Sequence, residues 1–100
     1  MSNPDRATGI VSLQGKRVLV TQASEFMGPM LCSVLAEAGA DVIADDSSLV
    51  DPGAPAAIVN KTGRVDVLVA NLAMAAPTTR APDVTDEEWQ TAFRHLVDPL

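Results

Sequence analysis

The apolar residues of this chain fall into short runs that alternate with longer amphipathic stretches. Residues 17–20, 41–44 and 65–70 are brief runs dominated by Val, Leu, Ile and Ala. Runs of this kind are typical of parallel strands that are buried on both faces. Because the amphipathic stretches between and after them have helical spacing, the pattern predicts an α/β fold with a parallel sheet.

The segment 26–38 is predicted to be the first helix. Pro29 falls in its first turn, where a missing N–H costs no hydrogen bond, and Gly39 is a typical residue just after a helix end. The apolar residues that repeat at helical spacing are Met27, Leu31, Val34 and Ala38.

The connection over residues 47–64 is short for this type of fold. Asp51-Pro52 is a good helix start and Gly63 a good stop, so one short helix fits, with Ile58 and Val59 expected on its inner side. A further strand has no room beyond a few residues. The sheet is therefore expected to lack the region that would lie beneath an adenine ring.

The last helix has a clear start. Thr85 and Glu88 form a capping box. An apolar stripe at helical spacing follows and is predicted to face the core; it comprises Trp89, Ala92, Phe93, Leu96 and Leu100. His95 lies off this stripe, so we expect a surface histidine, with a catalytic role as the weaker alternative. Pro99 should end or kink the helix.

Composition narrows the function classes. Seven basic against thirteen acidic residues give a net charge of -6, which argues against nucleic acid or an anionic membrane surface as partner. No run reaches the length of a membrane span, and residues 1–9 do not resemble a secretory signal. Cys32 is interpreted as a small buried hydrophobe rather than a reactive thiol. One Cys and one His rule out an ordinary Cys/His zinc site. We expect a cytoplasmic protein without a metal.

The domain organisation is predicted to be simple. Residues 1–13 look like a flexible N-terminal lead-in. Residues 14–100 look like the N-terminal portion of a single Rossmann-like domain, a doubly wound parallel sheet that appears incomplete at Leu100. Such a piece has unpaired sheet edges on both sides, so we do not expect it to fold as a stable monomer alone.

The turn over residues 21–28 is the first candidate for function. In doubly wound folds the turn after the first strand binds a dinucleotide pyrophosphate on glycine backbone. Here only Gly28 remains, and Phe26 would occupy the space that a phosphate needs. Asp45 and Asp46 end the second strand. They are either acceptors for an adenosine ribose or a solvated strand end with a helix-capping aspartate.

The segments 13–21, 65–71 and 85–89 resemble the short-chain dehydrogenase/reductase superfamily. Three departures fall on functional positions of that superfamily. Its glycine-rich turn appears as residues 21–28, its Asn-Asn-Ala-Gly appears as Asn71-Leu72-Ala73-Met74, and the asparagine of its proton relay is Leu96. These departures argue against hydride transfer.

The turn is similar to that of halohydrin dehalogenases, a branch of this superfamily whose signature is Thr, four residues, Phe, one residue, Gly. Thr21, Phe26 and Gly28 match it. The resemblance implies a cofactor-independent lyase that converts vicinal haloalcohols to epoxides and halide, and opens epoxides with small anions. It implies a homotetramer or dimer, with a catalytic Ser, Tyr and Arg located after Leu100.

The resemblance also assigns roles within this chain. Phe26 is expected to line a halide or nucleophile pocket that Thr21 and Gly28 help to shape. The substrate-pocket rim is expected to comprise Asn71, Leu72 and Met74. Two alternatives stay open: an NAD(P)-dependent short-chain oxidoreductase with a degenerate glycine turn, and a catalytically inactive relative that serves as a binding or oligomerisation partner.

Overall fold

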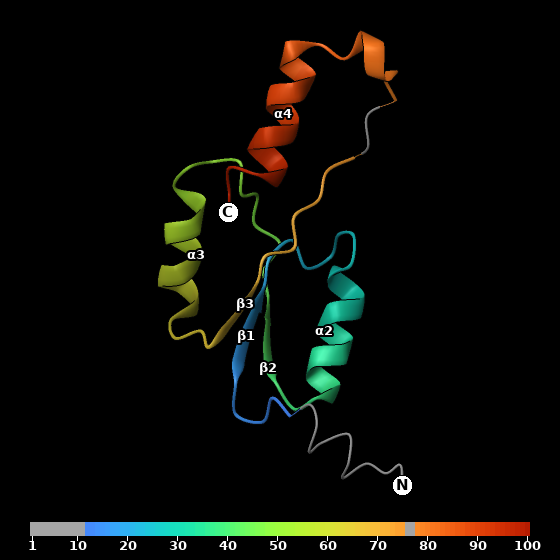
Figure 1. Ribbon diagram of the computed structural model, residues 1–100. Helices are drawn as coiled ribbons and strands as arrows, with labels where there is room; N and C mark the ends of the chain where they lie inside the picture. Colours follow the sequence, from blue (N-terminus) through green and yellow to red (C-terminus); the bar gives the residue numbers. More distant parts are fainter. Residues whose placement is uncertain (1–11, 76–77) are drawn as a thin grey trace, which may run out of the picture.

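The computed structural model describes residues 12–75 and 78–100, and over this part the chain is an α/β protein built on a three-stranded parallel sheet. The strands are β1 (Arg17–Val20), β2 (Asp41–Ala44) and β3 (Val67–Val69), in the order β2-β1-β3 (Figure 1). The predicted lead-in falls largely outside the described residues. The predicted α/β class and the parallel sheet are confirmed.

Strand β1 is the centre of the sheet and of the core. Val18 and Val20 have no exposed surface, and Leu19 is almost as deeply buried. Each pairs with both neighbouring strands; Leu19, for example, lies opposite Ile43 of β2 and Leu68 of β3. A mostly apolar strand flanked on both edges by parallel partners is buried because helices cover the faces of such sheets.

Strand β3 is shorter than the predicted run of residues 65–70. It ends at Val69 because the N–H of Asn71 donates to the carbonyl of Val69 at 3.0 Å, which bends the chain away from the ladder. Its exposed Leu68 shows that the sheet is thinly covered at this edge.

Helix α2 (Gly28–Glu37) follows β1 and packs on one face of the sheet, with Cys32 and Leu35 against the core valines. It begins two residues later than predicted because Phe26 has φ +50°, a left-handed conformation that cannot belong to a right-handed helix. Gly39 follows its end with φ +96°, so the predicted glycine stop is confirmed.

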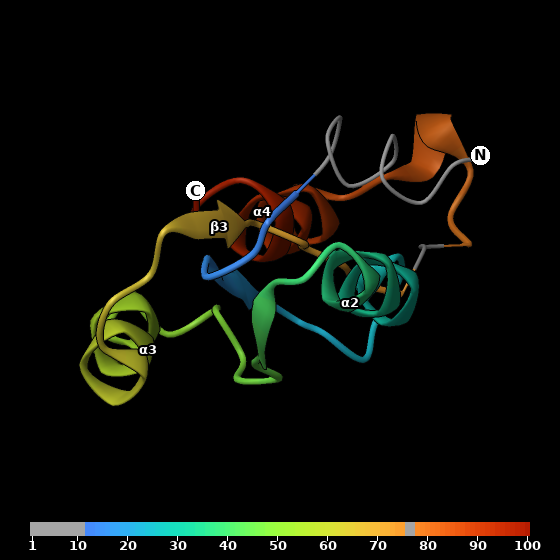
Figure 2. The same cartoon turned by 90° about the horizontal axis from the view of Figure 1, so that it is seen from below.

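Helix α3 (Ala54–Thr62) connects β2 to β3 and ends at Gly63, which has φ +72°. Figure 2 shows α2 and α3 on opposite sides of the sheet, the arrangement of a doubly wound fold. Asp51 does not cap the first turn directly; its carboxylate accepts the N–H of Gly53 at 2.9 Å. Ile58 is buried as predicted, whereas the prediction for Val59 was wrong because its side chain is 58% exposed.

Helix α4 (Asp86–Leu96) follows a short 3-10 turn (Ala81–Asp83) and lies above the carboxyl ends of the strands (Figure 1). The predicted capping box is present: Thr85 Oγ1 accepts the N–H of Glu88 at 3.1 Å. The predicted core position of the stripe was wrong for the described part of the chain. Trp89 is 61% exposed and Phe93 is 40% exposed, because no other described element packs closely on that face.

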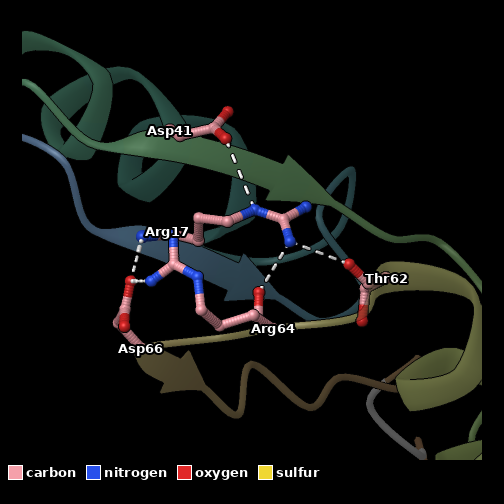
Figure 3. A network of polar contacts seen from close by, with 5 residues as sticks. All are labelled: Arg17, Asp41, Thr62, Arg64 and Asp66. Carbon is pink, nitrogen blue, oxygen red and sulfur yellow. Dashed lines mark hydrogen bonds and ion pairs between the residues drawn. The ribbon is translucent and has the colours of Figure 1, made fainter.

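An arginine cluster ties the opposite, amino-terminal edge of the sheet together (Figure 3). The guanidinium of Arg17 donates to the carbonyls of Thr62 and Arg64 at 3.0 and 2.8 Å, and lies 3.5 Å from the carboxylate of Asp41. The backbone N–H of Arg17 donates to Asp66 at 2.8 Å, which lowers the pKa of that carboxyl. One residue of β1 thus links β2 with the end of α3 and the start of β3.

Among residues 12–75 and 78–100, no helix has the length and apolar character needed to cross a membrane.

Replacing Val20, the last residue of β1, tests this account of the core. Val20→Ala should lower the free energy of unfolding by about 2 kcal/mol, because it removes buried methyl groups and leaves a cavity. Val34→Ala is the matched control, since this valine on α2 is 53% exposed and its loss should cost much less. Urea unfolding followed by circular dichroism measures both. Equal losses for the two variants would contradict the assignment of β1 as the core strand.

Candidate functional site

A crevice opens at the carboxyl ends of β1, β2 and β3, the place where doubly wound sheets bind ligands. It holds a cavity of about 440 Å³, within the size range of small-molecule sites. Its walls come from the turn after β1, the end of β2, the loop after β3 and the last turn of α4. The residues that matter for its chemistry are Gln22, Ser24, Glu25, Asp46, Met74 and His95.

The turn after β1 is joined to the loop after β3 by a set of hydrogen bonds, here called the turn clasp, made by Thr21, Gln22, Asn71 and Ala73. Thr21 Oγ1 donates to the carbonyl of Asn71 at 2.9 Å. The side-chain amide of Asn71 donates to the carbonyls of Gln22 and Glu25 at 2.9 and 3.0 Å. The expected role of Thr21 in shaping the turn agrees with these contacts.

Gln22 completes the clasp with both ends of its amide. Its Nε2 donates to the carbonyl of Ala73 at 3.0 Å, and its Oε1 accepts the N–H of Ala73 at 2.9 Å. Gln22 itself has φ +43°, an uncommon conformation for a residue with a side chain. The paired hydrogen bonds to Ala73 compensate for this backbone strain.

Gly28 is required by close packing within the turn. A Cβ atom at this position would lie 2.2 Å from the carbonyl oxygen of Ala23, far inside van der Waals contact. Gly28 therefore shapes the turn and lets α2 begin directly against it. Its backbone N–H is also occupied, because it donates to the carbonyl of Glu25 at 2.8 Å.

Other N–H groups of the turn are likewise taken by the protein. Ala23 donates to the carbonyl of Asp45 at 3.0 Å, and Ser24 donates to the carboxylate of Asp46 at 2.8 Å. This hydrogen bond from the Ser24 backbone lowers the pKa of Asp46. The turn thus binds the carboxylate of Asp46, an anion supplied by the protein itself, in the region where doubly wound folds hold a phosphate.

Asp45 has a structural role. It is 4% exposed, and its carboxylate accepts the N–H and the hydroxyl of Ser47 at 2.9 and 3.0 Å. Lys61 of α3 lies 3.3 Å away and neutralises the charge. The interpretation of this pair as a solvated strand end was wrong for Asp45, because Ala23, Ser47 and α3 cover it.

The predicted site residues do not lie together in one cavity. Thr21 and Asn71 are buried together in the clasp, and Met74 lines the 440 Å³ cavity. Leu72 lines a second, smaller and mostly apolar cavity of about 100 Å³ between α3 and β3. Phe26 lines neither of these two cavities, and its side chain is 77% exposed. Its halide-pocket role stays a prediction.

His95 was placed at the surface by sequence reasoning, yet it is half-buried and lines the main cavity. Its Nδ1 lies 2.9 Å from the carbonyl oxygen of Thr91, one helical turn earlier. A signal for this position exists in the sequence, because His95 lies in the last turn of the helix that follows the crevice loop. The sequence does not show how that helix is oriented over the strand ends.

Comparison with known proteins adds no identification, because no family model and no curated protein matches the chain. In residues 12–75 and 78–100 there is also no group of three or more His, Cys, Asp or Glu side chains placed to hold a metal ion.

The contact between Ser24 and Asp46 predicts a pH dependence of stability. The folded-state pKa of Asp46 is lowered, so its stabilising effect is present above the unfolded value of about 3.9 and is lost as pH falls through the folded-state pKa. Wild type should therefore exceed Asp46→Asn in stability at about pH 6, and the gap should close towards about pH 2.

Urea unfolding across this pH range measures the gap. Asp98→Asn is the control, because the carboxylate of Asp98 accepts no hydrogen bond within the described part of the chain. A gap that stays constant with pH for Asp46→Asn would contradict the proposed hydrogen bond.

Proposed function

We propose that the chain belongs to a halohydrin dehalogenase-like lyase of the short-chain dehydrogenase/reductase type. Its reaction would convert a vicinal haloalcohol to an epoxide. A base removes the hydroxyl proton, the oxygen attacks the neighbouring carbon, and the carbon–halogen bond breaks with its electron pair leaving on the halide. By the resemblance, the Ser, Tyr and Arg that carry this chemistry follow Leu100.

The observation that carries this proposal is the closed state of the turn after β1. A dinucleotide pyrophosphate needs free backbone N–H groups in this turn. Here Ala23, Ser24, Glu25 and Gly28 all donate to acceptors of the protein itself. The turn follows the first strand as in other doubly wound folds, but these four N–H groups bind acceptors of the protein and are not free for a ligand.

The charge of the crevice weakens the dinucleotide alternative. Glu25 and Asp46 both line the 440 Å³ cavity, and none of the described lining residues is Lys or Arg. Two carboxylates in a crevice repel a pyrophosphate, which carries negative charge of its own. A neutral haloalcohol pays no such electrostatic penalty, so the crevice favours it over a dinucleotide.

The oxidoreductase alternative depended on Asp45 and Asp46 as acceptors for a ribose. The carboxylate of Asp45 is buried against Ser47 and Lys61, and that of Asp46 accepts from Ser24. Both groups already have partners within the protein, which weakens this alternative. The inactive relative stays an alternative, since it would keep the same fold and the same closed turn.

Halide release is the direct test of the proposal. A polypeptide that continues beyond Leu100 into the expected Ser, Tyr and Arg should release chloride or bromide from a vicinal haloalcohol without any nicotinamide. We expect turnover well above the buffer blank, measured as halide and acid production. Millimolar NAD(P)H should give no thermal shift. Oxidation of the alcohol with NAD or NADP would identify the oxidoreductase instead, and silence in both assays would favour the inactive relative.

Phe26→Ala tests the predicted halide pocket. If the phenyl ring is a wall of that pocket, halide inhibition should weaken by about tenfold, while stability changes by no more than about 0.5 kcal/mol because the ring is exposed. Met30→Ala is the matched control, an exposed apolar residue one turn further along α2. Unchanged halide inhibition in a folded Phe26→Ala variant would remove Phe26 from the pocket.

A further inference from the structure

His95, in the last turn of α4, lines the main cavity and has no role in the proposed reaction. It is the single histidine of the chain, and its helix lies above the carboxyl ends of the strands (Figure 1). We propose that the crevice binds a small neutral alcohol, with the hydroxyl of the ligand donating its hydrogen bond to Nε2 of His95.

The contact of the other ring nitrogen fixes the direction of this hydrogen bond. Nδ1 of His95 lies 2.9 Å from the carbonyl oxygen of Thr91. A carbonyl oxygen can only accept, so Nδ1 must carry the hydrogen. In a neutral imidazole the second nitrogen then has a free lone pair, and Nε2 is a hydrogen-bond acceptor. The ring therefore suits a ligand that donates.

The orientation of the ring is held by its own helix. Thr91 lies four residues before His95, so the contact spans one turn and fixes the side chain against the backbone of α4. The capping box of Thr85 and Glu88 closes the first turn of α4, and Glu88 also accepts the hydroxyl of Thr79 at 2.5 Å. An acceptor fixed in this way loses little conformational entropy when a ligand binds.

The rest of the cavity selects the charge of the ligand. Glu25 and Asp46 contribute carboxylates, Ser24 contributes a hydroxyl, and Met74 contributes an apolar wall. None of the described lining residues is Lys or Arg, so no cation of the cavity offsets the repulsion between these two carboxylates and an anionic ligand. A neutral molecule with one hydroxyl and a short apolar part matches an acceptor nitrogen beside a thioether wall.

This inference rests on the proposed function, because that function is the reason for choosing a haloalcohol as the probe. In the lyase reaction the hydroxyl must be held before its proton is removed. Since a hydroxyl has one hydrogen, His95 would be a positioning residue that holds the alcohol before this hydrogen turns to the catalytic base, and it would take no part in the proton transfer itself. The hydrogen bond itself requires no halogen in the ligand, so binding can be measured apart from the reaction.

Nitrogen NMR of the single histidine tests the proposal on the 100-residue chain labelled with 15N-histidine, at about pH 8. In the free protein we expect Nδ1 to be protonated and Nε2 to be unprotonated. Titration with 1-chloro-2-propanol should move the Nε2 resonance in a saturable way towards the hydrogen-bonded position. The control ligand 1-chloropropane has the same carbon chain without the hydroxyl and should leave Nε2 unchanged.

Variants separate the role of Nε2 from general packing. His95→Asn keeps a donor near the position of Nδ1 and loses Nε2, so the affinity for the alcohol, measured by amide shifts, should fall about tenfold. His95→Gln places a polar group near Nε2 and should recover part of this loss. Arg94→Gln changes the neighbouring residue, which does not line the cavity, and should leave the affinity unchanged.

Several results would overturn the inference: a protonated Nε2 in the free protein, equal responses to the two ligands, or unchanged affinity in His95→Asn. The test also separates this inference from the lyase proposal. Halide release by a polypeptide whose His95 ignores the alcohol would retain the lyase and reject the role of His95. An alcohol response at His95 without halide release would retain the binding site and reject the lyase.

Discussion

The hydrogen bonds of Asn71 are the interaction on which the crevice depends. Its side-chain amide, just after β3, donates to two carbonyls of the turn after β1. In the reverse direction, the hydroxyl of Thr21 donates to the carbonyl of Asn71. Because Thr21 and Asn71 are buried, any of these polar groups left without a partner would cost about 1–3 kcal/mol. The clasp therefore holds a turn that contains two non-glycine residues with positive φ, Gln22 and Phe26.

The amino-terminal and the carboxyl-terminal ends of the strands, here the two edges, are held by different interactions. At the amino-terminal edge, Arg17 links three segments through its guanidinium, but its ion-pair partner Asp41 is solvent-exposed, and exposed ion pairs contribute little. At the carboxyl edge the contacts are buried and mostly neutral. At this second edge, the N–H groups of Ala23, Ser24, Glu25 and Gly28 donate to acceptors of the protein itself.

The position of the crevice could be predicted from the sequence, but most of its lining residues could not; of the predicted site residues, Met74 lines the 440 Å³ cavity. The loss of glycines and the presence of Phe26 predicted a turn unsuited to pyrophosphate, and the N–H groups of Ala23, Ser24, Glu25 and Gly28 donate to acceptors of the protein. The capture of the Ser24 N–H by Asp46 could not be read from the sequence, because it depends on how β1 and β2 align. His95 was missed for a similar reason. Its position off an apolar stripe indicates a surface residue only if the stripe faces the core, whereas Trp89 on that stripe is exposed.

The sequence by itself determined the glycine stop and the capping box, because Gly39 and the pair Thr85 and Glu88 act through local backbone conformation and local hydrogen bonds. The strands at 17–20 and 41–44 could be predicted from their apolar runs, although their hydrogen bonds are made to other strands. Only the tertiary structure decided which polar groups meet across the crevice. Asn71 lies 49 residues from its partner Gln22, and a contact at that separation is set by the order and register of parallel strands. Local sequence patterns do not encode that register, because in a parallel sheet the strands are joined by long crossovers.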